Sequence, residues 1–282
     1  MNKNIIIILI SLLVLFYSCD KINDPYIPMP VKEWYGKRAI IEDYTGHFCP
    51  NCPDAAAMGA LIDSIYGDKV IIVAVHSNDY FSKPRPNLPE DFRTEAGTAW
   101  YNFFGIASAG LPNGMINRTG FPQKSHIVYH DLWPSKVSKV LSQIPEMDIE
   151  INSTYDTVAK KLSGTVTTKF LKTIKKKLMI QLLITEDSII APQQNHSNID
   201  PNYVHRHMLR DVVNGIWGAT LTNGLAANTV NSEINYNFSY SLKQNFPPDT
   251  PGINWKHASL VVFIYDADNY EILQANQMHF KN

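Results

Sequence analysis

The chain of 282 residues has little cysteine, almost no net charge and few long apolar runs. It carries 25 basic and 26 acidic side chains, which give a formal net charge of −1. This balance provides no electrostatic footprint for nucleic acid or for an anionic membrane surface. After the first 20 residues, no apolar run is long enough to cross a bilayer. At 45% hydrophobic residues the chain can bury a core, and its length allows two domains. We therefore expect a globular protein with no nucleic-acid partner.

The long apolar run lies at the N-terminus and is typical of a signal peptide. Lys3 is followed by a mostly apolar stretch from Ile5 to Phe16, which is shorter than the ~20 residues of a membrane-spanning helix. A charged start, a short apolar core and a small residue, Ser18, form the pattern of an exported protein. The next residue, Cys19, completes a site that resembles a bacterial lipobox. We expect a signal peptide over 1–18 and membrane attachment through a lipid on Cys19; the alternative is an ordinary signal peptide with a chance cysteine.

The chain has three cysteines, and their positions limit the disulfide chemistry. If lipid occupies Cys19, only Cys49 and Cys52 remain, in the sequence Cys-Pro-Asn-Cys. In an oxidising envelope this pair either forms a disulfide or stays available for exchange. We expect no cofactor and no metal site. Cys49, Cys52 and His47 are three possible zinc ligands, and the local sequence offers no fourth. His205 and His207 lie in the second predicted domain.

The pattern of apolar and polar residues predicts two different domains after a tether at 19–33. Residues 34–145 alternate strands and helices: a strand at about 38–44, a helix that Pro53 opens and Gly67 ends, and a buried strand over 69–76 form a βαβ unit.

Residues 146–282 carry about seven short runs that alternate apolar and polar side chains. The clearest run is Ile234 to Leu242, which predicts a half-buried antiparallel strand. This pattern favours an antiparallel β-sandwich of immunoglobulin-like size. His205 and His207 are two residues apart, so on such a strand they share one face, either as ligands or as part of a polar surface.

The Cys-Pro-Asn-Cys sequence lies between the first predicted strand and the first predicted helix. Unpaired N–H groups and the positive end of the helix dipole stabilise a thiolate there. Cys52, one turn further on, can reach Cys49 for a disulfide. We expect Cys49 to be an exposed nucleophile with Cys52 behind it. His47 is either a proton carrier for Cys49 or an exposed turn residue with no such role.

Three features of residues 34–145 together resemble the thioredoxin superfamily. The cysteine pair follows the first core strand, Asp43 lies six residues before Cys49, and Leu111-Pro112 opens a later strand. The resemblance implies that Asp43 is a buried acid that moves the proton of Cys52, and that Pro112 follows a cis bond beside the disulfide. Phe48 replaces the usual tryptophan, so the direction of exchange is not predicted.

A closer resemblance covers most of the chain. The segments Glu42 to Pro53, Gly110 to Arg118, His205 to Asp211 and Asn214 to Gly218 are similar to the outer membrane protein 28-related lipoproteins. This Gram-negative family combines a thioredoxin-like α/β domain with a β-sandwich. The resemblance implies attachment to the outer membrane, on its periplasmic face or at the cell surface, and implies no reaction.

Two functional hypotheses follow for this α/β plus all-β chain. In the first, the protein is a thiol–disulfide oxidoreductase for envelope proteins: Cys49 attacks, Cys52 resolves, Asp43 relays a proton and Pro112 holds the substrate strand. In the second, it is a surface binding or adhesion protein in which Cys49–Cys52 is a static disulfide. The sandwich and residues 78–90 then supply the binding surface. So short a loop restricts the unfolded chain little, which argues mildly against a purely stabilising role.

Overall fold

The computed structural model describes residues 36–123, 125–244 and 252–281. The predicted signal peptide, the tether and Cys19 lie outside these residues. Within the described ranges, no helix is long and apolar enough to cross a membrane. The chain from Tyr35 onward forms one compact unit. Strands in several sheets dominate it, together with a few helices, which agrees with the predicted combination of α/β and all-β structure at this coarse level.

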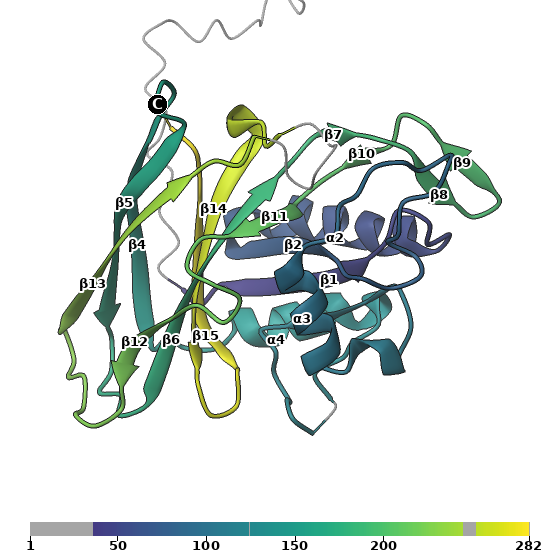
Figure 1. Cartoon of the computed structure of the whole chain (residues 1–282). Helices are drawn as coiled ribbons and strands as arrows, with labels where there is room; N and C mark the ends of the chain where they lie inside the picture. Colours follow the sequence, from purple (N-terminus) through teal and green to yellow (C-terminus); the bar gives the residue numbers. More distant parts are fainter. Residues whose placement is uncertain (1–35, 124, 245–251, 282) are drawn as a thin grey trace, which may run out of the picture. The chain divides into compact units, whose positions relative to one another are not determined.

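One large sheet contains strands from both sides of residue 145 (Figure 1). Its order is β15-β14-β6-β11-β2-β1-β3, and β12 pairs with β6 outside this path. β1 and β2 are parallel, and β11 lies next to β2 through the pair Met208–Ala74 and antiparallel to β6. The two halves of the sequence are therefore joined by backbone pairing. The bounds are β1 (Ala39–Thr45), β2 (Val70–His76), β3 (Asn113–Ile116), β6 (Lys177–Glu186), β11 (Met208–Val212), β12 (Ala219–Asn223), β14 (Ala258–Asp266) and β15 (Ile272–His279).

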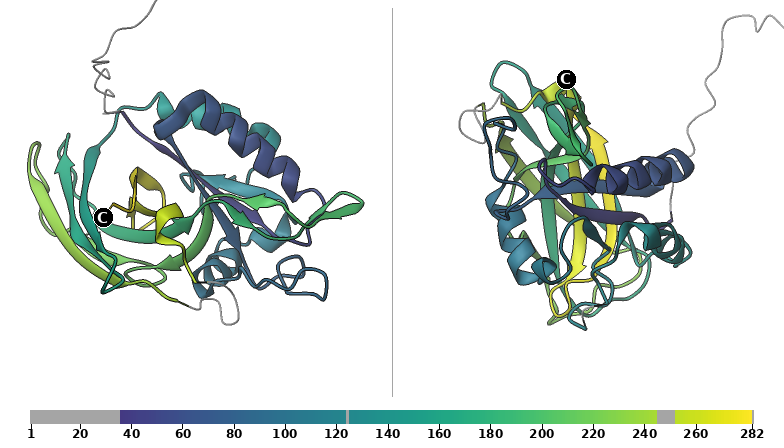
Figure 2. Two further views of the ribbon diagram at one scale, coloured as in Figure 1. Left: turned by 90° about the horizontal axis from the view of Figure 1, so that it is seen from above. Right: turned by 90° about the vertical axis from the view of Figure 1, so that its right-hand side faces the viewer.

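Helices cover both faces of the β1–β2 region (Figure 2). α2 (Cys52–Tyr66) and α4 (Trp133–Leu141) pack on the side chains of β1 that include Ile41, whereas α3 (Glu95–Phe103) packs on the face that includes Ile40. This double cover explains why β2 is a continuous apolar run up to His76 and why β1 begins with the apolar residues Ala39 to Ile41. α2 has proline in its first turn and ends at Gly67, whose φ is 55°, as predicted. The 3-10 helices are η1 (Gly67–Lys69), η2 (Ile106–Ser108), η3 (His130–Leu132) and η4 (Trp255–His257).

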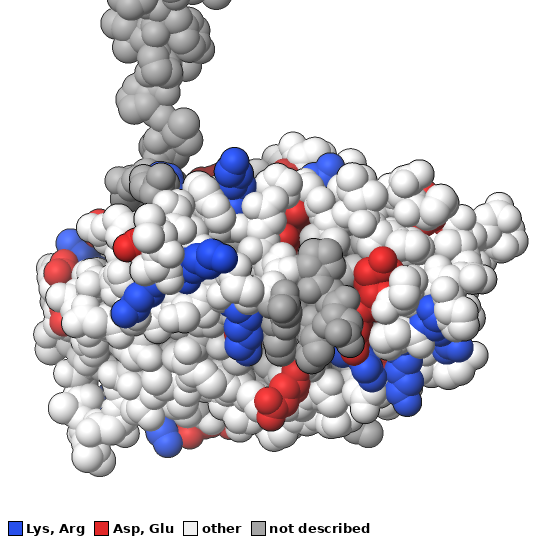
Figure 3. Space-filling model, turned by 45° about the horizontal axis from the view of Figure 1, so that its top comes forward, with Lys and Arg blue, Asp and Glu red and all other residues white. Residues whose placement is uncertain are grey.

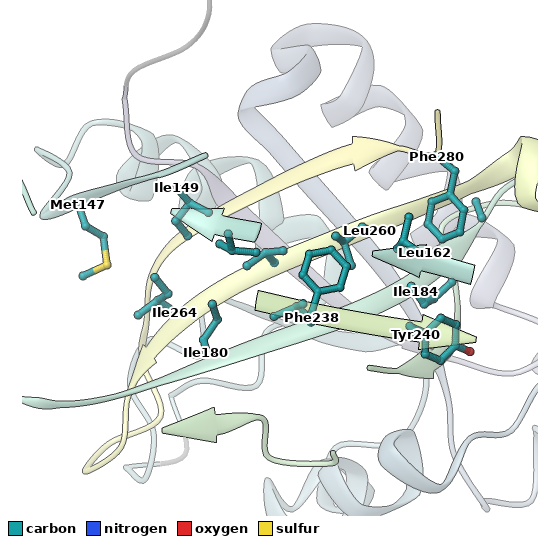
Figure 4. Close-up of a cluster of buried hydrophobic side chains, with 14 of the residues drawn as sticks. Met147, Ile149, Leu162, Ile180, Ile184, Phe238, Tyr240, Leu260, Ile264 and Phe280 are labelled. Carbon is teal, nitrogen blue, oxygen red and sulfur yellow. The ribbon is translucent and has the colours of Figure 1, made fainter. Parts of the chain in front are cut away.

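The second half forms a sheet-on-sheet core. The strands β13 (Glu233–Ser241), β5 (Lys161–Phe170) and β4 (Met147–Asp156) make an antiparallel sheet. Phe238 and Tyr240 lie within the same buried cluster as Ile184 and Leu260 of the large sheet (Figure 4). Alternate residues of β13 are exposed, as its period of two predicts. On the face shown in Figure 3, basic and acidic side chains are interspersed among uncharged ones.

A segment between β6 and β11 carries four short strands that sequence periodicity did not reveal. They are β7 (Ile189–Ile190), β8 (Gln193–Asn195), β9 (Asn198–Asp200) and β10 (Val204–His205). β7 pairs with β10, and β8 pairs with β9. We refer to residues 193–200 as the β8–β9 hairpin. Strands of two or three residues are too short to show an alternating pattern, and this segment proves to form part of the candidate site.

Candidate functional site

Cys49 and Cys52 form a disulfide at the start of α2. Cys49 lies in the turn after β1, where its N–H donates to the carbonyl of Gly46 at 3.0 Å. The N–H of Cys52 donates to the carbonyl of Cys49 at 3.3 Å as the helix begins. The pair therefore lies between a strand and a helix, as predicted.

Both cysteines are buried, and the prediction of an exposed Cys49 was wrong. Each is only 1% exposed. The β8–β9 hairpin packs on the loop that carries them, and its backbone N–H groups at Gln194 and His196 donate to the carbonyls of His47 (2.7 Å) and Pro50 (2.9 Å). The side-chain amide of Gln193 also donates to the carbonyl of Cys49 at 3.2 Å. These partners lie more than 140 residues later in the sequence, so local patterns around Cys49 could not reveal them.

Residues 78–90 pack on another side of the disulfide loop. The N–H of Phe48 donates to the carbonyl of Phe81 at 2.9 Å. The guanidinium of Arg85 lies 3.9 Å from the centroid of the Phe48 ring, and the Tyr80 ring is 5.8 Å from it. Phe48 is thus held between aromatic and cationic partners.

Asp43 is buried on β1, with 4% of its surface exposed. Within the described part of the chain, its Oδ1 atom has no hydrogen-bond partner. Burial raises the pKa of this carboxyl to about 7, because a charged group is poorly solvated there. Asp43 and Cys52 line the same pocket, so the acid lies on the side of the disulfide that holds the second cysteine.

Pro112 follows a cis peptide bond, as predicted for Leu111–Pro112. It directly precedes β3, whose first residue, Asn113, pairs with Tyr44. This register places Pro112 near the end of β1 from which the disulfide loop leaves. A second cis bond, Phe121–Pro122, was not anticipated.

Three histidines from distant parts of the chain lie around Phe92. The ring centroids of His47, His76 and His205 are 6.0, 5.5 and 5.1 Å from that of Phe92. All three are buried. Burial lowers the pKa of His47 and of His205 to about 4 and also lowers the pKa of His76. The cluster is therefore uncharged at neutral pH.

This cluster corrects two expectations from the sequence. His47 is buried rather than exposed, because the β8–β9 hairpin and Phe92 cover it. His205 belongs to the site although it comes from the second half. His207, with a φ of 53°, lies outside the short strand that contains His205. In the ranges that the structure describes, no group of three or more His, Cys, Asp or Glu side chains is placed to hold a metal ion.

A pocket of about 370 Å³ lies beside the disulfide. It lies at the carboxyl ends of the parallel strands β1 and β2, where α/β sheets commonly bind ligands. The sequence did not reveal this pocket, although the run of small residues in α2 was a signal of it. The lining includes Asp43, Cys52, His76 and His205, the small helix residues Ala56, Ala57, Gly59 and Ala60, and Tyr203, Arg206 and Met208.

The chain belongs to the family of outer membrane protein Omp28, whose family model matches residues 98–282. The predicted family is thereby confirmed. Membership associates the chain with the outer membrane. A comparison with curated proteins finds no match.

Several solved structures are similar to this one. HBP35 of Porphyromonas gingivalis is 18% identical with a TM-score of 0.62, and the match covers 88% of this chain and 77% of that one. A structural genomics protein from Agrobacterium tumefaciens is 11% identical with a TM-score of 0.53, over 89% and 97% of the two chains. A domain of the outer membrane lipoprotein Omp28 from Porphyromonas gingivalis is 24% identical with a TM-score of 0.34, over 49% and 91%. The first two indicate a shared fold.

Proposed function

We propose that the protein is an outer membrane lipoprotein that exchanges disulfides with envelope proteins through Cys49 and Cys52. The buried carboxyl of Asp43, which shares a pocket with Cys52, is the observation that carries this proposal. A buried polar group without a partner costs free energy. A static disulfide has no need of such a group, whereas an exchanging one uses a proton donor and acceptor near the second sulfur.

The arrangement around the disulfide supports a thioredoxin-like assignment for the first half. A parallel β1–β2 pair is connected through α2, the cysteine pair opens that helix, and a proline after a cis bond precedes β3. The immunoglobulin-like assignment of the second half stays a prediction; two antiparallel β layers around one buried cluster support it.

Exchange with a substrate dithiol starts from the oxidised pair. A substrate thiolate attacks the Cys49 sulfur, so that a mixed disulfide forms and the Cys49–Cys52 bond breaks. Cys52 leaves as a thiolate and takes a proton from Asp43. The second substrate thiol passes its proton to Asp43 and, as a thiolate, attacks the mixed disulfide. Cys49 leaves, and the substrate becomes a disulfide. The reverse sequence reduces a substrate disulfide.

The burial of both sulfurs adds a step to this scheme. A substrate thiolate must approach Cys49 along the S–S axis, and the β8–β9 hairpin lies over the loop that carries the disulfide. We infer that the hairpin moves away before exchange, which breaks its hydrogen bonds to His47, Cys49 and Pro50. The rate of exchange then depends on the free energy of this opening.

The same burial favours a second candidate function. If the hairpin never opens, Cys49–Cys52 is a static disulfide in a surface binding protein. Residues 78–90 and the β-sandwich then supply the contact surface for an envelope or surface partner.

An exchange assay separates these functions. The full chain is mixed with a fluorescent dithiol peptide, and formation of the peptide disulfide is followed over pH 5–9. If the protein is an oxidoreductase, Cys49→Ser should abolish the reaction. Asp43→Asn should slow it by about 100-fold, the low end of general acid–base catalysis, and change the pH profile near pH 7. Asp63→Asn, an exposed change on the same helix as Cys52, should leave it unchanged. A wild-type disulfide that stays inert in the folded chain but reacts once the chain is unfolded supports the binding function instead.

A further inference from the structure

The pocket beside the disulfide has features that neither disulfide exchange nor fold stability requires. Its volume of about 370 Å³ lies in the lower range of small-molecule sites. One wall is apolar and built from the small side chains of α2, with Ile72, Ala74 and Met208 as its floor. Ala56, Ala57 and Ala60 are exposed, so their small side chains leave this wall open to solvent, where the longer side chains of Leu or Met would narrow it.

The inner end of this pocket is polar and its groups are unpaired. His76, Asp43 and His205 are 2%, 4% and 5% exposed, and all three line the pocket. Among the described residues, Asp43 Oδ1, both ring nitrogens of His76 and His205 Nε2 have no hydrogen-bond partner. Native proteins seldom leave several buried polar atoms together without partners, so the set indicates a ligand that supplies them.

The chemistry of these groups selects the ligand. An ionised carboxylate only accepts hydrogen bonds, and each neutral imidazole offers one acceptor nitrogen. The carboxyl is the buried group of the lining that can carry charge near neutral pH, because burial keeps both imidazoles neutral. The guanidinium of the lining, that of Arg206, belongs to an exposed residue rather than to this buried set. A ligand group with several donors and a positive charge fits this inner end, and an anion does not.

We propose that this pocket binds a small organic amine, with its ammonium group between Asp43 and the two imidazoles and its apolar body along α2. An ammonium has three donors, which match the acceptors of Asp43, His76 and His205. The apolar body lies against Ala56, Ala57 and Ala60. This inference goes beyond disulfide exchange and concerns the protein in its oxidised form.

Three probes with one apolar body and different head groups test the proposal. Hexylamine, hexanol and hexanoate are titrated separately into the full oxidised chain at pH 8, and binding is measured by calorimetry. We expect hexylamine to bind about tenfold more tightly than hexanol, a ratio that corresponds to about 1.4 kcal/mol, and hexanoate to bind most weakly. Equal affinity for amine and alcohol, tighter binding of hexanoate, or no binding of any probe at millimolar concentration would overturn the proposal.

Two variants with matched controls locate the site. Asp43→Asn should remove the preference for amine over alcohol, whereas Asp63→Asn, on the exposed side of α2, should retain it. Ala56→Leu fills the mouth with a good helix-forming residue and should weaken all probes, whereas Ser64→Leu, outside the lining, should not. An unchanged amine preference in Asp43→Asn contradicts the site. Because the disulfide stays intact throughout, failure here leaves the exchange proposal standing, and failure of exchange leaves this one standing.

Discussion

Gln193→Ala tests whether the β8–β9 hairpin controls access to the disulfide. The side chain of Gln193 is 3% exposed, and its amide donates to the carbonyls of Gly46 at 3.3 Å and Cys49 at 3.2 Å. Those carbonyls also accept from the N–H groups of Cys49 and Cys52. The change to alanine therefore leaves neither carbonyl without a partner, and it keeps the backbone bonds of the hairpin to His47 and Pro50.

Of the three hydrogen bonds that the Gln193 amide donates, one stays within the hairpin, at 2.9 Å to the carbonyl of Gln194, and the magnitude follows from the two that reach the disulfide loop. A neutral hydrogen bond contributes about 0.5–1.5 kcal/mol net. The free energy of opening the hairpin should therefore fall by about 1–3 kcal/mol. Since about 1.4 kcal/mol is a factor of ten, the open population should rise by about 5- to 150-fold. If reduction occurs through the open form, the rate of reduction rises by the same factor.

The assay measures reduction of Cys49–Cys52 by dithiothreitol, with alkylation and mass measurement at successive times. Gln194→Ala is the matched control, because its side-chain amide donates to the carbonyls of His196 and Asn198 within the hairpin rather than to the disulfide loop. These exposed bonds should change the rate by only about twofold. If Gln193→Ala is reduced at the wild-type rate, the hairpin does not govern access and the proposed opening step is wrong.

Three further predictions concern stability and anchoring. Arg118 and Glu42 form a fully buried ion pair with two hydrogen bonds of 2.7 and 2.8 Å. Arg118→Met should lower the free energy of unfolding, measured with urea, by about 3–5 kcal/mol. Adding Glu42→Gln to this variant should recover part of the loss. No recovery would show that the unpaired carboxylate is not the cause. The pKa values of His47 and His205 are about 4 when folded against an ordinary 6.5, so the unfolded chain binds more protons between these values. The free energy of unfolding should therefore fall as pH is lowered from about 6.5 to about 4, and His47→Phe should flatten this slope. Cys19→Ala should leave a protein that is uncleaved or soluble, as measured by phase partitioning in detergent, and mature wild-type protein found wholly in the aqueous phase would exclude the lipid anchor.

Local sequence patterns predicted the elements that hold the cysteine pair. The apolar runs of β1 and β2, the proline in the first turn of α2 and Gly67 at its end are properties of short segments. They fixed the position of Cys49 and Cys52 between a strand and a helix. The alternating residues of β13 likewise predicted a half-exposed strand, because its exposure follows from its own period.

The environment of the site depended on contacts between distant segments. Cys49 and His47 are buried because the hairpin at 193–200 covers them, and its strands are too short to leave a periodic signal. β11 lies beside β2, and this pairing brings His205 close to His76. The sequence pattern had placed these two histidines in different predicted domains. The pocket, the histidine cluster and the burial of both sulfurs follow from this pairing, so none of them could be predicted locally.

Trapping of a mixed disulfide tests the proposed function most directly. Cys52→Ser removes the thiol that shares a pocket with Asp43 and leaves Cys49 able to bond with a substrate but unable to release it. After expression in its native envelope, this variant should carry proteins bound through Cys49 that separate on reduction, and Cys49→Ser should carry none. The contrary result is that both variants carry the same adducts or none, while the wild-type disulfide is unchanged by glutathione.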